Sequence, residues 1–299
     1  MKKEVLGFLN VDKPSGPTSH DVIQQLRQIT GIQKMGHTGT LDPLASGVLP
    51  ICVGKATRLS EYLTGSDKRY LATIQLGQRS STYDAEGQLS PVSDISNIQE
   101  RELLSTLAQL TGEIQQTVPV YSAVKRDGKK LYQLARAGIQ VSPPMRKVFI
   151  QELKLKRWCK PQLEVEVHCS SGTYIRSLAH DVGERLGVGA HLSALKRIAS
   201  GPFQLCHARS TAELAASGNW KRHLLDPVWP FQSWSKISFH LEEATALCQG
   251  KTTPIHETET AEKLALALYR DRLIAVVQAV AGAWQPIKVF RAAHQLEHG

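Results

Sequence analysis

The residues best suited to chemistry lie in one glycine-rich loop near the start of the chain. Residues 34–47, KMGHTGTLDPLASG, have neither a helical nor a strand period and contain three glycines and a proline. The loop carries His37, Thr38, Thr40 and Asp42, and loops on a rigid scaffold are where proteins usually place reactive groups. Taken singly, an Asp-Pro pair is also typical of a turn and a lone histidine of a structural hydrogen bond. The loop alone therefore leaves its chemistry open.

A carboxylate such as Asp42 can act as a nucleophile only if it stays ionised while partly buried, which requires a cation or several donors beside it. Arg176 is a candidate partner. It falls in the first turn of a helix expected over 173–186, where free N–H groups and the helix dipole also favour an anion. The alternative is a surface arginine, because its position between Ile175 and Leu178 looks exposed. A buried Asp42–Arg176 pair would be costly to break from either side.

Short strands and helices must position these groups. Alternation and apolar runs predict strands at 6–11, 48–53, 70–76, 148–155 and 163–169. The strand at 70–76 alternates strictly, which is typical of a half-exposed strand. Caps and apolar spacing predict helices that start at Ser19 and near Asn97 and others over 55–63, 131–137, 173–186 and 242–249. The helix near Asn97 would bury Leu103, Leu104, Leu107 and Leu110.

The positive charge is unevenly distributed. The whole excess of +9 lies in residues 1–235, since residues 236–299 hold seven basic and seven acidic residues. Residues 121–160 alone contain eleven basic and two acidic residues. Residues 112–147 also break the strand and helix patterns, so we expect a basic excursion from the main body. It is either a solvated face or a polyanion contact, and self-repulsion favours the second interpretation.

Length and composition exclude several classes. A chain of 299 residues exceeds the size of one hydrophobic core, and we place a domain boundary near Ser235. No run of eighteen apolar residues could cross a membrane, and no apolar run follows the basic N-terminus as in a secretory signal. Five widely spaced cysteines without a C-x-x-C pair argue against a zinc or dithiol site and for reduced thiols in the cytoplasm.

Residues 36–50, GHTGTLDPLASGVLP, resemble the catalytic motif of the TruB family, the tRNA pseudouridine 55 synthases. Four further segments resemble family motifs in the same order: KPSGPTS at 13–19, KRY at 68–70, residues 77–87, and CSSGTYIRSL at 169–178 with its continuation to residues 201–203. The resemblance is strong from Gly7 to Phe203. Beyond Ser235 the chain resembles the small PUA-like RNA-binding domain of bacterial members.

The resemblance implies an α+β pseudouridine synthase fold. The expected catalytic domain, residues 1–235, has a mixed, mostly antiparallel central sheet, flanking helices and a thumb-like insertion at about 112–147; residues 236–299 form a β-rich PUA-like domain. The implied reaction detaches uracil 55 of the tRNA T-arm loop from its ribose and rejoins it through C5. This isomerisation needs no cofactor and no metal, and the sequence contains neither a P-loop nor a metal-ligand cluster.

The resemblance also assigns roles to individual residues. Asp42 is the catalytic carboxylate, with two roles open, nucleophile at the ribose or base at its C2′. Arg176 keeps it ionised, and Tyr70 stacks on the target base and can assist a proton transfer. Tyr174 and Leu192 line the pocket. The remaining positions implied to bind substrate are His37, which fills the space left by the extruded base, and Lys13, Thr40, Asp84, Tyr121, Lys125, Lys129 and Lys130.

A buried nucleotide must be flipped out before a carboxylate can reach it, at a cost of a few kcal/mol. The cations of the thumb-like segment would grip tRNA phosphates and offset part of that cost. One departure from the family is Val118-Pro119-Val120-Tyr121, where two prolines commonly precede the thumb tyrosine.

Two other functions compete with a stand-alone tRNA isomerase. One is the guide-RNA-dependent branch of the superfamily, and the other is a tRNA-binding folding chaperone with little or no isomerase activity. The thumb-like segment, a short neutral C-terminal domain and the absence of lysine-rich tails favour the stand-alone type, with no guide RNA or membrane partner and a monomeric state. Intact Asp42, Tyr70 and Arg176 argue against a purely binding role.

Overall fold

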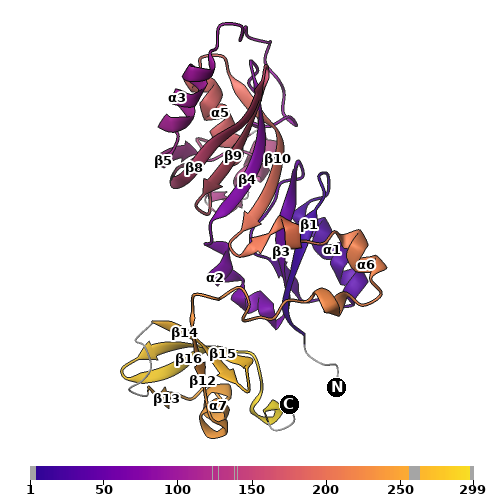
Figure 1. Ribbon diagram of the computed structural model, residues 1–299, viewed down its shortest axis with the longest axis vertical. Coiled ribbons are helices and arrows are strands. Elements are labelled where there is room, and N and C mark those ends of the chain that lie inside the picture. Colours follow the sequence, from indigo (N-terminus) through magenta and orange to yellow (C-terminus); the bar gives the residue numbers. More distant parts are fainter. Residues whose placement is uncertain are drawn as a thin grey trace.

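The computed structural model describes residues 5–122, 124–126, 128–137, 139, 141–255 and 263–296. Figure 1 shows an elongated molecule in which a long twisted sheet is followed by a second, smaller sheet at the C-terminal end. The chain enters the large sheet first, leaves it for a basic segment, returns to it, and then builds the second sheet. No helix in the described ranges is both long and apolar enough to span a membrane.

The large sheet is mixed and mostly antiparallel, as predicted. Its main path runs β1-β3-β10-β4-β9-β8-β5, and only the β3–β10 pair is parallel. The bounds along this path are β1 Leu6–Lys13, β3 Ala45–Gly54, β10 Ala190–Ser200, β4 Lys68–Leu76, β9 Gln162–Cys169, β8 Met145–Cys159 and β5 Gly112–Thr117; β2 (Met35–His37) pairs with β3 and β11 (Phe203–Gln204) with β10.

Helices flank the large sheet. Those predicted from Ser19, near Asn97 and over 173–186 are present, the one predicted over 55–63 begins as a 3₁₀ helix at Lys55–Leu59, and the helix at Thr211–Ala216 was not predicted. Their bounds are α1 Ser19–Thr30, α2 Ser60–Thr64, α3 Glu100–Gln109, α5 Ile175–Arg185 and α6 Thr211–Ala216. The N-cap of α1 is Thr18 rather than Ser19: its hydroxyl accepts from the Asp21 N–H, and the Asp21 carboxylate accepts from the Thr18 N–H at 2.8 Å. Ser19 is instead hydrogen-bonded to the main chain of Leu41.

The start of α3 was predicted wrongly. The helix begins at Glu100, its N-cap is Gln99 without a side-chain cap, and Asn97 lies outside it. Leu103 is buried as expected, whereas Leu104 is 47% exposed. The pattern of Asn97 followed three residues later by Glu100 suggested that Asn97 is the N-cap. Glu100 is instead the first helical residue, so Asn97 lies too far from the helix to cap it.

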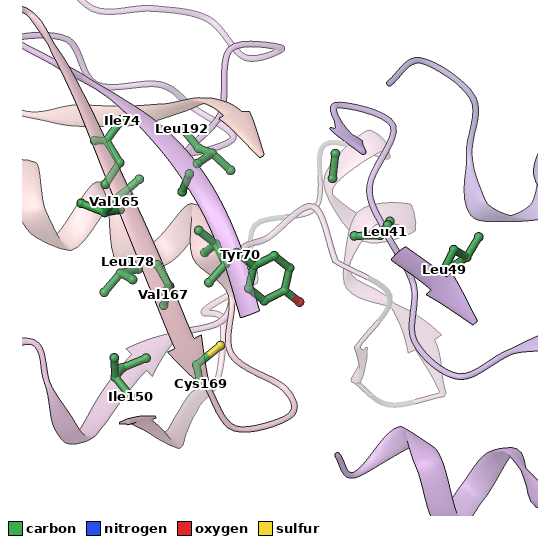
Figure 2. Close-up of a cluster of buried hydrophobic side chains, with 14 of the residues drawn as sticks. Leu41, Leu49, Tyr70, Ile74, Ile150, Val165, Val167, Cys169, Leu178 and Leu192 are labelled. Atoms are coloured by element: carbon green, nitrogen blue, oxygen red, sulfur yellow. The ribbon is translucent and has the colours of Figure 1, made fainter. Parts of the chain in front are cut away.

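The strict alternation in β4 is confirmed and decides what faces the core. Lys68, Tyr70, Ala72, Ile74 and Leu76 are buried, and the residues between them are exposed or half-buried. Figure 2 shows Tyr70 between two parts of one apolar cluster, the side chains of β4, β9 and α5 on one side and Leu41 and Leu49 on the other, with its hydroxyl on the side of Leu41 and Leu49. The strand therefore brings the Tyr70 hydroxyl from its buried face toward the loop that precedes β3.

The basic segment leaves and rejoins the large sheet at its edge. Residues 112–117 of the expected excursion form β5, which pairs with β8 from Gly112↔Ile150 to Thr117↔Met145. The part outside the sheet is therefore 118–144. It contains the hairpin of β6 (Lys125–Arg126) and β7 (Lys129–Lys130) and helix α4 (Leu131–Arg136).

The second sheet begins at Ser235 and has the order β12-β14-β15-β16-β13. Its bounds are β12 Ser235–Ser238, β14 Leu264–Tyr269, β15 Arg272–Val280, β16 Ala283–Val289 and β13 Thr253–Pro254, with α7 at Leu241–Cys248. An apolar cluster joins it to the main body, because Phe8 and Leu59 share buried contacts with Val276 and Phe290. Lys55 also donates to the Phe290 carbonyl at 2.8 Å.

Candidate active site

A cavity of about 260 Å³ opens where the Asp42 loop, the start of β4 and the start of α5 meet. Strands β3, β4 and β10 hold its floor, since they are neighbours in the sheet. The side chains that line it and bear on chemistry are Thr40, Asp42, Lys68, Tyr70, Ser122, Tyr174, Arg176, Leu195 and Arg197. All three residues predicted to be catalytic, Asp42, Tyr70 and Arg176, thus line one cavity.

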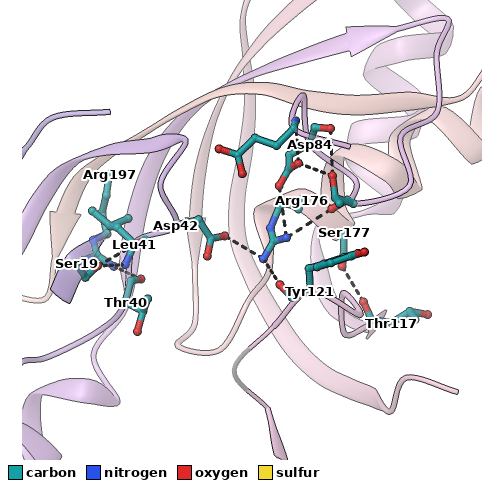
Figure 3. A network of polar contacts seen from close by, with 12 residues as sticks. Ser19, Thr40, Leu41, Asp42, Asp84, Thr117, Tyr121, Arg176, Ser177 and Arg197 are labelled. Carbon is teal, nitrogen blue, oxygen red and sulfur yellow. Dashed lines mark hydrogen bonds and ion pairs between the residues drawn. The ribbon is translucent and has the colours of Figure 1, made fainter. Parts of the chain in front are cut away.

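Asp42 stands at this cavity on a turn closed by the Ala45 N–H, which donates to the Asp42 carbonyl at 3.1 Å. The predicted turn chemistry and the predicted ion pair are both present. Arg176 Nη2 lies 3.0 Å from Asp42 Oδ2, and the Asp42 side chain is 44% exposed. Figure 3 shows the carboxylate directed at the guanidinium. A half-exposed carboxylate held by a cation can stay ionised and still be reached by a substrate.

Arg176 is buried, so the alternative of a surface arginine is wrong. Its side chain is 7% exposed, and its Nη1 lies 3.4 Å from the Asp84 carboxylate. Its Nη2 also donates to the Tyr121 carbonyl at 3.0 Å. The position does lie in the first turn of α5, as predicted. The helical spacing alone suggested that Arg176 is exposed, because it does not include the residues from other segments, 82–84 and Tyr121, that cover the start of α5.

Tyr70 is 8% exposed and lines the cavity. Burial raises the pKa of its phenol, an effect that the positive charge of Arg197 and a hydrogen bond with it oppose. The phenol is therefore protonated at neutral pH, and it presents a ring and a hydroxyl to the cavity.

Two cations on the same floor were missed from the sequence. Lys68 is buried, its ammonium donates to the carbonyls of Thr64 and Ser66, and burial lowers its pKa to about 8. Arg197 is 1% exposed. A signal existed for Lys68, since it lies two residues before Tyr70 and so on the same face of the strand.

Tyr174 lines the cavity as predicted, and Gln116 fixes it. The buried Gln116 amide accepts from the Tyr174 N–H at 3.0 Å and donates to the Tyr174 carbonyl at 3.2 Å. Leu192 is 1% exposed and packs in the core; it is absent from the lining, where Leu195 is found instead. A bulge between Leu192 and Ala194 puts both leucines on one face, with Leu195 closer to Tyr70.

Two of the predicted substrate-binding residues contact the protein instead. Lys13 is fully buried, and its ammonium donates to the carbonyls of Pro14, Pro43 and Ala45, at 2.7 Å for Ala45. Asp84 is 3% exposed and accepts from the Glu86 N–H and from Arg176. Both groups use their polar atoms to support the loop or its arginine.

Of the other predicted residues, Thr40 lies in the cavity, whereas His37 and Tyr121 lie outside its lining. His37 is in β2 and outside the lining; burial lowers its pKa, and its Nδ1 has no hydrogen-bond partner among the described residues. Thr40 is exposed and lines the cavity. Tyr121 is 39% exposed beside Arg176.

Three lysines, which we call the hairpin lysines, lie on the hairpin between β5 and β8: Lys125, Lys129 and Lys130. Lys129 is exposed, and the side chains of the other two lie outside the described residues.

Among the described residues, no group of three or more His, Cys, Asp or Glu side chains is arranged to hold a metal ion. The cysteines are free thiols. The cavity instead offers a carboxylate, a phenol, aromatic and aliphatic faces, and three cations. This set suits acid–base or nucleophilic chemistry on a ligand that carries negative charge.

Comparisons with known proteins bear on the family. The model of the TruB family pseudouridylate synthase N-terminal domain matches residues 27–175, and that of the tRNA pseudouridylate synthase B C-terminal domain matches residues 176–229. The tRNA pseudouridine synthase B of Geobacillus thermodenitrificans is 42% identical to this chain over 95% of its length and 99% of the relative's. This chain belongs to the TruB family. The homologous enzyme of Symbiobacterium thermophilum is 45% identical over 83% of each chain.

Solved structures support the same assignment of the fold. A Cbf5–Nop10–Gar1 complex contains a chain with a TM-score of 0.74 and 26% identity, covering 96% of this chain and 86% of that one. An H/ACA RNP bound to a substrate RNA containing 2′-deoxyuridine gives a TM-score of 0.73 at 25% identity with the same coverage. The predicted pseudouridine synthase fold is confirmed, and the Asp42 loop lies inside the segment that matches the TruB N-terminal model.

Proposed function

We propose that this chain is an isomerase that converts uridine 55 in the T-arm loop of tRNA to pseudouridine. The observation that carries the proposal is the Asp42–Arg176 pair at 3.0 Å on the cavity wall. TruB membership supplies the reaction class, and the pair supplies the ionised carboxylate that the reaction requires. The N1–C1′ bond of the uridine breaks and a C5–C1′ bond forms, with the C5 proton lost and a proton gained at N1, so no group donor is consumed.

In this account Asp42 is the catalytic carboxylate, acting on the ribose at C1′ or on its C2′ proton. Arg176 keeps it ionised and is itself oriented by Asp84 and the Tyr121 carbonyl. Tyr70 stacks on the extruded base, and its protonated hydroxyl is available for a proton transfer. Tyr174 and Leu195 close the apolar part of the cavity, and Thr40 offers a hydroxyl at its edge.

The nucleotide reaches this cavity only by flipping out of the T loop. The cavity has room for a nucleotide but is too confined for a stem, which fits base extrusion. His37, whose neutral ring lies outside the cavity, is proposed to occupy the space that the base vacates. The hairpin lysines and Tyr121 are proposed to hold the T-arm backbone, because residues 118–144 extend from the sheet edge beside Arg176.

We further propose that residues 1–235 form the catalytic domain and residues 236–299 a PUA-like RNA-binding domain. The second sheet starts at Ser235 and has its own apolar cluster around Ile237, Ala265 and Trp284.

We favour a stand-alone enzyme that acts in the cytoplasm as a monomer without guide RNA. The curated relatives at 38–47% identity are named tRNA pseudouridine synthase B, whereas the Cbf5 complexes are 25–26% identical. A chaperone without isomerase activity would have no use for an ionised carboxylate at the cavity.

The test is to incubate the purified protein, without cofactor or added RNA, with an unmodified tRNA transcript and to map pseudouridine at nucleotide resolution. A single product at the T-loop uridine is expected, and none in a transcript with cytidine at that position. Binding without product in the first transcript would instead support a chaperone or a guide-dependent enzyme.

A further inference from the structure

Arg197 packs against the Asp42 loop, and its side chain takes no part in the reaction proposed above. Its guanidinium donates to three main-chain carbonyls: Nε to Val48 at 2.7 Å, Nη2 to Gly39 at 3.0 Å and Nη1 to Thr40 at 3.4 Å. Figure 3 shows Arg197 next to Leu41 and Thr40, on the side of Asp42 away from Arg176. One side chain thus holds the chain on both sides of Asp42.

This arrangement is energetically expensive. Arg197 is 1% exposed, and no carboxylate of the described residues forms an ion pair with it. A buried charge is costly unless it is paired or fully hydrogen-bonded, and here neutral carbonyls are its main acceptors. Costly local features of this kind concentrate at functional sites.

Arg197 also contacts the second reactive side chain. It faces Tyr70 directly in the β4–β10 ladder, both side chains line the cavity, and its positive charge opposes the rise in the pKa of the Tyr70 phenol that burial causes. In the parallel β3–β10 ladder it pairs with Gly47, whose φ is +99°, and a Cβ there would lie 2.2 Å from the Arg197 carbonyl oxygen. The main chain of Arg197 is therefore locked in place as well.

We propose that Arg197 is a positioning residue that fixes the Asp42 loop and the Tyr70 hydroxyl in one mutual geometry. The proposal rests on the proposed function, because the geometry it sets is that of the isomerisation. Arg197 acts through Gly39, Thr40 and Tyr70, so its loss displaces Asp42 while leaving the tRNA-binding surface in place. A misplacement of about 1 Å costs on the order of 100-fold in rate.

The first experiment compares Arg197→Met with Lys196→Met, the neighbouring exposed cation on the same strand. Arg197→Met is expected to lower the single-turnover rate of pseudouridine formation on the order of 100-fold, while the Kd for tRNA stays within about tenfold. Lys196→Met is expected to keep the wild-type rate. Equal effects of the two variants on the rate, or an Arg197→Met rate equal to that of wild type, would overturn the proposal.

Chemical rescue separates positioning from general damage to the fold. In Arg197→Ala the vacated space adjoins the cavity, so added guanidinium should restore part of the rate, whereas urea, its neutral analogue of the same shape, should not. Rescue by neither solute would overturn the proposal. Arg197→Lys keeps the charge but not the fork; it is expected to fold and still be slow, and a wild-type rate for it would also refute the proposal.

A measurement on the free protein needs no activity. Amide hydrogen exchange at Thr38, Leu41 and Ala45, whose N–H groups bond within or beside the loop, should speed up in Arg197→Met and not in Lys196→Met. Unchanged exchange would show that the loop does not need Arg197. A wild-type protein that forms no pseudouridine would refute the proposed function, and the exchange result would still decide whether Arg197 holds the loop.

Discussion

The buried Arg176–Asp84 contact makes the account testable without RNA. The two side chains are 7% and 5% exposed and lie 3.4 Å apart, whereas Asp42, the other partner of Arg176, is 44% exposed. Arg176→Met would leave Asp84 buried without its cation. Breaking a buried pair costs about 3–5 kcal/mol. Asp84 retains hydrogen bonds from Thr82 and the Glu86 N–H, so we expect the low end, about 3 kcal/mol.

The half-exposed Asp42 pair adds at most about 1 kcal/mol because water screens it. The assay is equilibrium unfolding in urea at pH 7 of Arg176→Met, Asp84→Asn and the double variant. The double variant should be more stable than the sum of the single effects predicts, by about 1–2 kcal/mol, since the amide introduced by Asp84→Asn carries no charge to leave unpaired.

The matched control is Arg79→Met, which breaks an Arg–Glu184 pair whose side chains are 48% and 42% exposed. It should destabilise the protein far less than Arg176→Met does, because water screens an exposed pair. Single effects of Arg176→Met and Asp84→Asn that add within about 0.5 kcal/mol would refute the buried coupling. So would an Arg176→Met cost as small as that of Arg79→Met.

Three further predictions concern RNA binding, pH and the loop. Replacing the hairpin lysines together by glutamine should weaken tRNA binding and reduce the slope of log Kd against log salt; an unchanged slope would remove the hairpin from the binding surface. Burial lowers the pKa of Lys68 in the folded protein to about 8, whereas the pKa of a lysine in the unfolded chain is about 10.4. Between these two pH values the unfolded chain binds more protons than the folded protein does. The contribution of Lys68 to the free energy of unfolding therefore rises with pH in this range, by up to about 1.4 kcal/mol per pH unit. The test is to measure the free energy of unfolding of wild type and of Lys68→Met across pH 8–10. Parallel pH dependences of the two proteins would contradict the prediction. Gly47→Ala should destabilise the protein by more than about 3 kcal/mol, because a Cβ at Gly47 would lie 2.2 Å from the Arg197 main chain. The control is Gly112→Ala, where φ is +94° but no atom lies near a Cβ, and it should cost about 1–2 kcal/mol. Similar unfolding midpoints for both would show that the close approach does not constrain Gly47.

The sequence was sufficient to predict many of the elements, though not β10 or α6, and to name Arg176 as a candidate partner of Asp42. The strands around β3, β4 and β9 and helices α1 and α5 follow from apolar period and glycine stops, because those signals are local. The Asp42–Arg176 pair followed from asking what an ionised carboxylate in a loop needs. The motif resemblance added the reaction, which spacing alone does not contain.

The features that could not be predicted from the sequence depend on tertiary contacts. Nothing in the sequence distinguishes Arg197 from the other basic residues. It reaches the Asp42 loop because β10 pairs with both β3 and β4. Leu192 was expected in the pocket from the family resemblance, but Leu195 lines the cavity, and the bulge in β10 that puts both leucines on one face cannot be predicted from residue spacing. Lys13 was expected to bind the substrate. In the folded protein its ammonium donates to main-chain carbonyls, including that of Ala45, which is distant in the sequence.

In the proposed reaction Asp42 performs the chemistry, and the decisive variant is Asp42→Asn. The substitution keeps the shape of the side chain, so tRNA binding should stay within about tenfold, or ~1.4 kcal/mol, while single-turnover pseudouridine formation at the T-loop uridine is abolished. Product formation by Asp42→Asn at the wild-type rate would contradict the claim, and simultaneous loss of binding and product would show that Asp42 is structural.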